Sequence, residues 1–110
     1  MDTIETYRNY LEKLMIERAN RIWDKRITAQ TIFDRERDHY QLVYVGWQES
    51  RRVYGVVLHA DIIEGKIWIQ EDGTEAGLAN QLVELGVPKD HIVLGFDPPK
   101  LRDLTDFAVG

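Results

Sequence analysis

The chain has 110 residues and a mass of 12.9 kDa, the size of one ordinary domain, and 44% of its residues are hydrophobic and 30% charged. This composition excludes an intrinsically disordered chain, and the absence of cysteine excludes disulfides, thiolate zinc sites and cysteine nucleophiles. No apolar run approaches the roughly 20 residues of a membrane-spanning helix, and no signal peptide opens the chain, so we expect a soluble cytoplasmic protein.

Charge is distributed unevenly along the chain, whose net charge is −5. Residues 60–110 hold ten acidic and four basic residues, whereas residues 1–37 hold seven acidic and eight basic ones. Because phosphate contacts supply most of the affinity of duplex-DNA binders, the acidic second half disfavours unaided DNA binding. Weak nucleic-acid contact stays open through six basic residues: Arg18, Arg21, Lys25, Arg26, Arg51 and Arg52.

An amphipathic helix is predicted at the N-terminus, within residues 2–25. Asp2 is suited to be its N-cap, with Glu5 three residues later, and apolar residues recur at helical spacing from Ile4 onward. The pattern can continue to Trp23, because neither glycine nor proline occurs in the first 45 residues.

Four strands are predicted next, over residues 28–34, 39–47, 52–62 and 66–71. β-Branched and aromatic residues are frequent in them, and the side chains alternate between two faces. The links between these segments are too short for parallel crossovers, which need about a dozen residues. The pattern therefore predicts a four-stranded antiparallel meander.

A second helix is predicted over residues 74–85, with Thr74 as its N-cap and with Gly86 and Pro88 ending it. A short apolar run, 92–96, leads into a tail that we expect to dock on the domain through Leu104, Phe107 and Ala108. The elements together predict one α+β domain over residues 1–110, with an N-terminal helix, the meander, a second helix and a docked C-terminal tail.

Both faces of the second and third predicted strands are substantially apolar, whereas a sheet covered on one side normally alternates apolar with polar residues. In simple register Tyr44, Tyr54 and Leu58 share one face. The other face then needs a cover from the N-terminal helix, the tail or another subunit. We predict a protein-interaction surface there, containing Trp47, Val57, His59, Asp61 and Trp68. The alternative is that both tryptophans are core residues beneath the tail.

His59 and Asp61 point to one face of a strand, where a metal-ligating triad would need His39 or His91 as its third member. An outward His–Asp pair at a sheet edge or interface explains the same spacing, so we expect no metal and no cofactor. The run Glu64-Gly65-Lys66 after Asp61 superficially resembles a nuclease array, but it fits a hairpin turn better.

The chain also shows neither a phosphate-binding glycine loop nor a nucleophile–base pair. We therefore expect that the protein is not an enzyme. A metal-dependent enzyme centred on His59 and Asp61 is the less favoured alternative.

The chain from residue 46 onward carries a distinctive series of motifs. They are Gly46-Trp47, Arg52-Val53-Tyr54-Gly55, His59-Ala60-Asp61-Ile62, Gly65-Lys66-Ile67-Trp68-Ile69-Gln70, Asp72-Gly73-Thr74-Glu75, Gly86-Val87-Pro88-Lys89, Ile92-Val93-Leu94-Gly95-Phe96 and Thr105-Asp106-Phe107-Ala108-Val109. This series resembles the XisI family, the fdxN-element excision controlling factors known chiefly from cyanobacteria. The resemblance covers nearly the whole chain and is densest from Tyr40 to Val109, with Ala60 a minor departure.

The resemblance implies a small α+β domain that controls excision of a DNA element by site-specific recombination during heterocyst development. It implies partners, namely a recombinase and typically a companion protein of the XisH type, and it supplies no catalytic residue set. We accordingly predict a non-catalytic accessory factor that acts through an XisH-like companion and forms a homodimer or higher oligomer. A direct DNA-binding accessory factor is the alternative.

Overall fold

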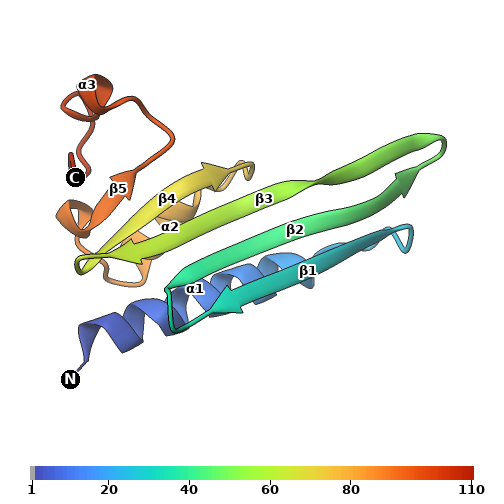
Figure 1. Ribbon diagram of the computed structural model, residues 1–110, viewed down its shortest axis with the longest axis horizontal. Helices are drawn as coiled ribbons and strands as arrows, with labels where there is room; N and C mark the ends of the chain where they lie inside the picture. The colour runs from blue at the N-terminus through green and yellow to red at the C-terminus, as the bar shows by residue number, and fades with distance from the viewer. Residues whose placement is uncertain (1) are drawn as a thin grey trace.

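The computed structural model describes residues 2–110 and shows a five-stranded sheet with the helices Thr3–Ala19 and Leu78–Glu84 packed on one side (Figure 1). In chain order the elements are α1 (Thr3–Ala19), β1 (Ile27–Asp34), β2 (His39–Gln48), β3 (Arg51–Ile63), β4 (Lys66–Asp72), α2 (Leu78–Glu84), a 3₁₀ turn (Lys89–His91), β5 (Ile92–Leu94) and α3 (Pro99–Arg102). The strands lie side by side in the order β1-β2-β3-β4-β5. The α+β class is therefore confirmed.

The sheet differs from the predicted meander by one strand. β1 to β4 are antiparallel neighbours as expected, but β5 adds to the edge of β4 in parallel, with Ile67 opposite Ile92 and Ile69 opposite Leu94. The sheet is thus mixed. A strand of three residues shows too little alternation to be recognised from sequence, and α2 provides the long crossover that parallel pairing requires.

Helix α1 begins as predicted and ends earlier. The Asp2 carboxylate accepts hydrogen bonds from the backbone N–H of Ile4 and Glu5 at 3.0 and 3.3 Å, which confirms it as the N-cap. The helix stops at Ala19, and Trp23 is 88% exposed in the loop beyond it. The chain turns there into β1, because Asp24 accepts bonds from the two residues that precede and begin that strand.

Helix α2 begins at Leu78, so the assignment of Thr74 as its N-cap is wrong. The Asp72 carboxylate performs the capping instead, accepting bonds from the Thr74 N–H and hydroxyl and, at 2.7 Å, from the Leu78 N–H. The end of the helix is as predicted. Gly86 has a φ of +103°, and the N–H groups of Gly86 and Val87 bond back to helix carbonyls in a Schellman motif.

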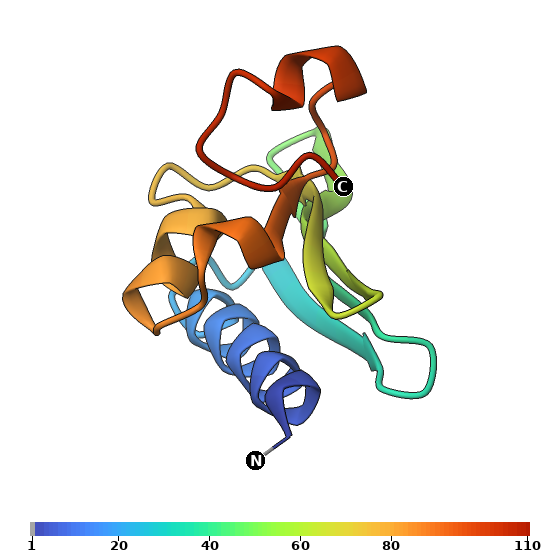
Figure 2. The ribbon, with the colours of Figure 1, turned by 90° about the vertical axis from the view of Figure 1, so that its left-hand side faces the viewer.

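The core lies between the helices and one face of the sheet (Figure 2). Its buried members from the helices are Tyr7, Leu11, Leu14, Met15, Leu78 and Leu82, and those from the sheet are Tyr40, Leu42, Leu58, Ala60, Ile62, Ile67, Ile69 and Ile92. Burial of one large apolar side chain contributes about 1.5–3 kcal/mol to folding, so this layer is the main source of stability. None of the helices formed by residues 2–110 is both long and apolar enough to span a bilayer.

A β-bulge in β3 changes which residues face the helices. Leu42 pairs with Leu58 but the next residue, Val43, pairs with Val56, so Val57 is an extra residue in the ladder. Val57 consequently packs against the core, and its assignment to the second face is corrected. The assignment of Tyr54 is corrected in the opposite sense, because its side chain lies on the second face.

The C-terminal tail, residues 96–110, docks as predicted at the β5 edge. The Ala108 N–H donates to the Ile92 carbonyl at 2.9 Å, and Phe107 packs partly buried against the core. Leu104 does not take part, because 82% of it is exposed. Docking therefore rests on Phe107 and Ala108 together with Arg102 of α3, and not on Leu104.

Candidate functional site

The second face of the sheet is uncovered over β1, β2 and β3. We call this surface the open face, and its apolar members are Ile32, Val43, Val45, Trp47, Tyr54 and Val56. No element formed by residues 2–110 lies over it, since α1 and α2 both pack on the opposite side (Figure 2). Exposed fractions of 50% for Trp47 and 72% for Tyr54 are large for aromatic side chains on a well-ordered sheet.

The aromatic residues of the open face are held by an arginine. The Arg52 guanidinium lies 5.3 Å from the ring centroid of Trp47 and 5.6 Å from that of Tyr54. Cation–π contacts of this kind fix the rings in place while they remain accessible. Tryptophan, tyrosine and arginine are also the residues most enriched among energetic hot spots of protein interfaces.

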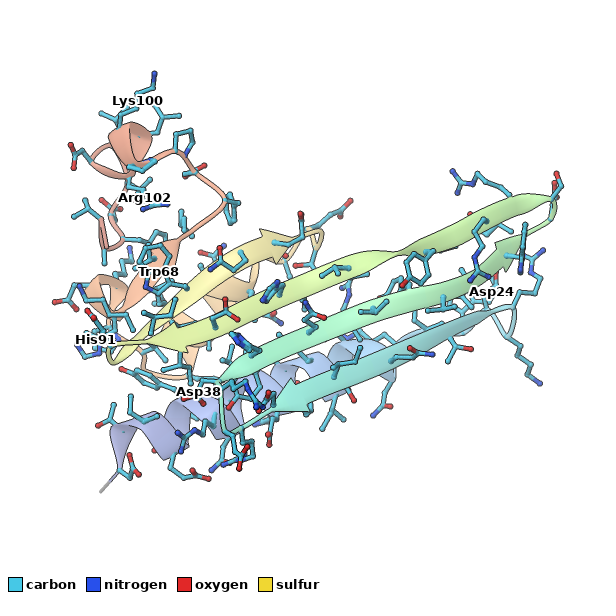
Figure 3. All side chains as sticks on the ribbon, viewed as in Figure 1. Asp24, Asp38, Trp68, His91, Lys100 and Arg102 are labelled. Carbon is cyan, nitrogen blue, oxygen red and sulfur yellow. The ribbon has the colours of Figure 1, made fainter. Side chains whose placement is uncertain are left out.

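Trp68 lies on the same side of the sheet but is partly covered. The Arg102 guanidinium sits 5.1 Å from the Trp68 ring centroid, and it also donates to the carbonyl oxygens of Asp97, Gly95 and Val109 (Figure 3). The sequence offered two interpretations for both tryptophans, an interaction surface or a position beneath the tail, and each interpretation holds for one of them. Trp68 belongs beneath the tail, and Trp47 belongs to the open face.

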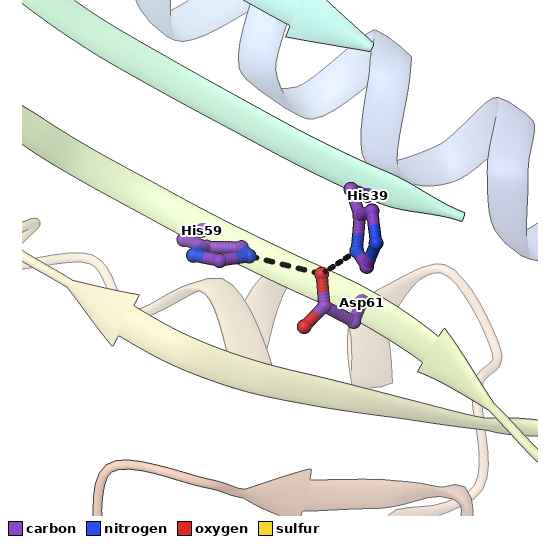
Figure 4. A group of neighbouring side chains, drawn as sticks. All are labelled: His39, His59 and Asp61. Atoms are coloured by element: carbon purple, nitrogen blue, oxygen red, sulfur yellow. Dashed lines mark hydrogen bonds and ion pairs between the residues drawn. The ribbon is translucent and has the colours of Figure 1, made fainter. Parts of the chain in front are cut away.

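Three metal-competent side chains meet at the edge of the open face; we call His39, His59 and Asp61 the His–Asp cluster. Asp61 Oδ1 accepts from His39 Nδ1 at 2.8 Å and from His59 Nε2 at 2.9 Å (Figure 4). Burial opposes ionisation of Asp61, yet the hydrogen bonds from the two histidines and from Gln70 lower its pKa below the ordinary value. The carboxylate is therefore charged at neutral pH.

The nuclease-like run near Asp61 is not assembled. Glu64 and Gly65 have φ angles of +50° and +81° and form the turn between β3 and β4, as the hairpin interpretation predicts. The groups that do gather around Asp61 are the two imidazoles, on β2 and on β3.

The predicted basic residues gather at one end of the molecule without forming one surface. They come from the end of α1, the loop before β1 and the start of β3. Arg51 and Arg21 line a pocket of about 360 Å³ on the helix side, whereas Arg52 belongs to the open face. Arg26 is paired with Asp24 at 2.9 Å. The positive charge is therefore divided between two faces and partly neutralised.

Several site residues escaped the sequence analysis. Tyr54 was assigned to the covered face because alternation was counted without the bulge, and Val56, which shares its face, was not recognised. The bulge also explains why the pairing of His39 with Asp61 was not predicted. Without the bulge, a ladder that starts at the Gln48–Arg51 pair places His39 opposite Ala60. A bulge leaves no distinctive residue in this sequence that could have revealed the shift.

Comparison with known proteins identifies the family. The family model for the XisI protein matches residues 1–109. The chain belongs to the XisI family. A crystal structure of a XisI-like protein from Anabaena variabilis is 40% identical, with a TM-score of 0.90, covering 99% of this chain and 100% of that one. No match is found among curated proteins.

A second XisI structure, the fdxN element excision controlling factor XisI from Anabaena variabilis, is 31% identical with a TM-score of 0.84 and the same coverage. The predicted resemblance is thereby confirmed over residues 1–109, including the N-terminal helix, which lies outside the densest part of the motif match. The similarity in fold thus extends from α1 to the docked tail.

Proposed function

We propose that this XisI-family protein is a non-catalytic accessory factor that controls excision of a DNA element by binding a protein partner, an XisH-like companion. Family membership supports the excision role, since a relative of the same length is described as an excision controlling factor. The observation that carries the partner-binding role is the open face, where Arg52 presents Trp47 and Tyr54 to solvent.

The chemistry of the open face suits a protein better than a nucleic acid. Ile32, Val43, Val45 and Val56 give it an aliphatic floor, and its aromatic rings are rimmed by a single guanidinium. Contact with duplex DNA needs many cations, whereas a protein interface needs a desolvated centre with a few aromatic anchors. The net charge of −5 points the same way.

Co-expression with the XisH-like companion, followed by size-exclusion chromatography, tests this function. We expect the two proteins to elute together, and we expect the double variant Trp47→Ala, Tyr54→Ala to elute separately because it removes both anchors. The matched control is Trp23→Ala, which removes a more exposed tryptophan from the α1–β1 loop, outside the open face. Co-elution of the double variant with the companion would show that the interface lies elsewhere.

The same chromatography, run without the companion, measures the homo-oligomer that we also propose. A dimer that persists in the Trp47→Ala, Tyr54→Ala variant would use a surface other than the open face. Elution as a monomer would contradict the proposed homo-oligomer and would leave the companion as the only proposed partner of the open face.

The non-catalytic part of the proposal has a separate test. We expect the purified protein to leave plasmid and single-stranded DNA intact in the presence of Mg²⁺ or Mn²⁺. DNA cleavage that disappears in an Asp61→Asn variant would overturn it and would favour the enzyme alternative centred on His59 and Asp61.

A further inference from the structure

We propose that the His–Asp cluster is a binding site for one divalent first-row transition-metal ion of the Zn²⁺ type, held by His39, His59 and Asp61. The ligand atoms of the three residues all lie within 4.8 Å of one another. Two imidazoles and one carboxylate on a common face are the donor set of many three-ligand metal sites.

The spacing of the donors fits a single ion. Tetrahedral metal–nitrogen and metal–oxygen bonds of about 2.1 Å place neighbouring ligand atoms about 3.4 Å apart. The distances from Asp61 Oδ1 to His39 Nδ1 and His59 Nε2 are 2.8 and 2.9 Å. An ion can therefore take the place of the two hydrogen-bonded protons once each imidazole moves about 0.5 Å away from Asp61 Oδ1.

The residues around the cluster orient it for ligation. Gln70 donates to Asp61 Oδ2 at 3.2 Å, which leaves Oδ1 directed at the two imidazoles. Gln41 lies 3.4 Å from His59 Nδ1, the ring nitrogen opposite the one that faces Asp61. Rotation of the Gln41 amide lets its oxygen accept from Nδ1–H, which frees Nε2 for a metal.

Burial and access also suit a bound ion. The Asp61 side chain is 11% exposed and the His59 side chain 27%, so both are largely shielded from water, whereas the His39 side chain is 55% exposed and borders solvent. A pocket of about 390 Å³ opens beside all three. Because the protein supplies three ligands, coordination positions remain for water or for a donor group from outside the chain.

The sheet backbone places the three ligand residues next to one another. All three residues come from paired strands, since His39 lies directly opposite Asp61 in the β2–β3 ladder and His59 is two residues before Asp61. The adjoining carboxylate of Asp34 is engaged at Oδ1 by the backbone N–H groups of Glu36 and Arg37 and at Oδ2 by the Arg37 side chain, and these bonds oppose its use as a further ligand.

The test uses untagged, EDTA-treated protein titrated with Zn²⁺ by calorimetry at pH 7.5, and with Co²⁺ by visible absorption. We expect one equivalent of Zn²⁺ to bind and to raise the melting temperature by roughly 5 °C at saturation. His39→Ala changes an exposed side chain, so the variant should remain folded, and it should lose roughly 100-fold or more in affinity.

Two further variants sharpen the result. His91→Gln removes the only histidine outside the cluster and should bind Zn²⁺ as the wild type does. Gln41→Leu should weaken binding by roughly 10- to 100-fold, because it removes the partner of His59 without removing a ligand. The proposal is overturned if about 100 µM Zn²⁺ gives no binding, or if His39→Ala binds as tightly as the wild type.

Discussion

Arg102 and Trp68, from segments 34 positions apart in the chain, form the contact that holds the C-terminal tail against the sheet. The guanidinium stacks on the ring at 5.1 Å and bonds to tail carbonyls, among them that of Asp97 at 3.1 Å. The Arg102 side chain thus connects separate parts of the tail to one another and connects the tail to β4. This contact partly covers Trp68, whereas Trp47 stays 50% exposed on the open face.

Arg102→Ala should release the tail without unfolding the domain. We expect the free energy of unfolding to fall by about 1–2 kcal/mol, and the amide protons of residues 96–110 to exchange much faster. Hydrogen exchange measured by mass spectrometry checks both effects. Lys100→Ala, on the same short helix and exposed, is the control and should leave exchange unchanged. Unchanged exchange in Arg102→Ala would show that the tail docks without this contact.

Gly46→Ala adds only one methyl group, but it should destabilise the domain strongly. A Cβ at this position would lie 2.1 Å from the Arg26 carbonyl oxygen, so the start of β1 would have to move. We expect a loss of about 1–3 kcal/mol in urea unfolding. Gly55→Ala is the matched control in the neighbouring strand, because nothing lies within 4 Å of its Cβ, and it should change stability by less than about 0.5 kcal/mol.

Asp38 should contribute to acid sensitivity. Hydrogen bonds from Arg8, and to a lesser extent from the Tyr40 hydroxyl, hold the pKa of the Asp38 carboxyl below its ordinary value. The unfolded chain therefore takes up this proton first as pH falls. The stabilisation is present above pH about 4 and is lost as pH decreases through the lowered pKa.

Asp38→Asn tests this contribution. Asparagine tolerates the φ of +58° at this turn, so the change removes mainly the charge. We expect the free energy of unfolding at pH 7 to fall by about 1.5–3 kcal/mol and its slope between pH 4 and 2 to become shallower than in the wild type. Asp103→Asn, an exposed control, should leave both unchanged. An unaltered slope in Asp38→Asn would assign acid sensitivity to other carboxyl groups.

Direct DNA binding should be weak. The basic residues are divided between two faces, and Arg26 is neutralised by Asp24. Fluorescence anisotropy with duplex DNA should give a dissociation constant no tighter than about 10 µM at about 150 mM salt. Submicromolar binding that weakens steeply with salt would contradict this and would support the alternative of a DNA-binding accessory factor.

Most of the fold was predictable because its signals are local. The Asp2 cap, the Gly86 stop and the alternation in four strands each depend on a few neighbouring residues. β5 was missed because three residues are too few for a periodic signal, and Thr74 was misassigned because Asp72 reaches over it to cap α2.

The candidate site was predictable only in part. Trp47, His59 and Asp61 were placed on the correct face, but Val57 and Tyr54 were exchanged by a bulge that no residue type announces. Register is a property of two strands together, and a shift of one residue reverses every side chain beyond it. The same shift brings His39 to Asp61, so the His–Asp cluster required the structure.

Calorimetric titration of the purified XisH-like companion into this protein tests the central claim most directly, by comparing the wild type with Trp47→Ala. We expect saturable binding by the wild type and a dissociation constant about 30-fold higher for the variant, the loss that corresponds to about 2 kcal/mol at an interface hot spot. Equal affinities, or no binding by the folded wild type, would contradict the assignment of the open face as the partner interface.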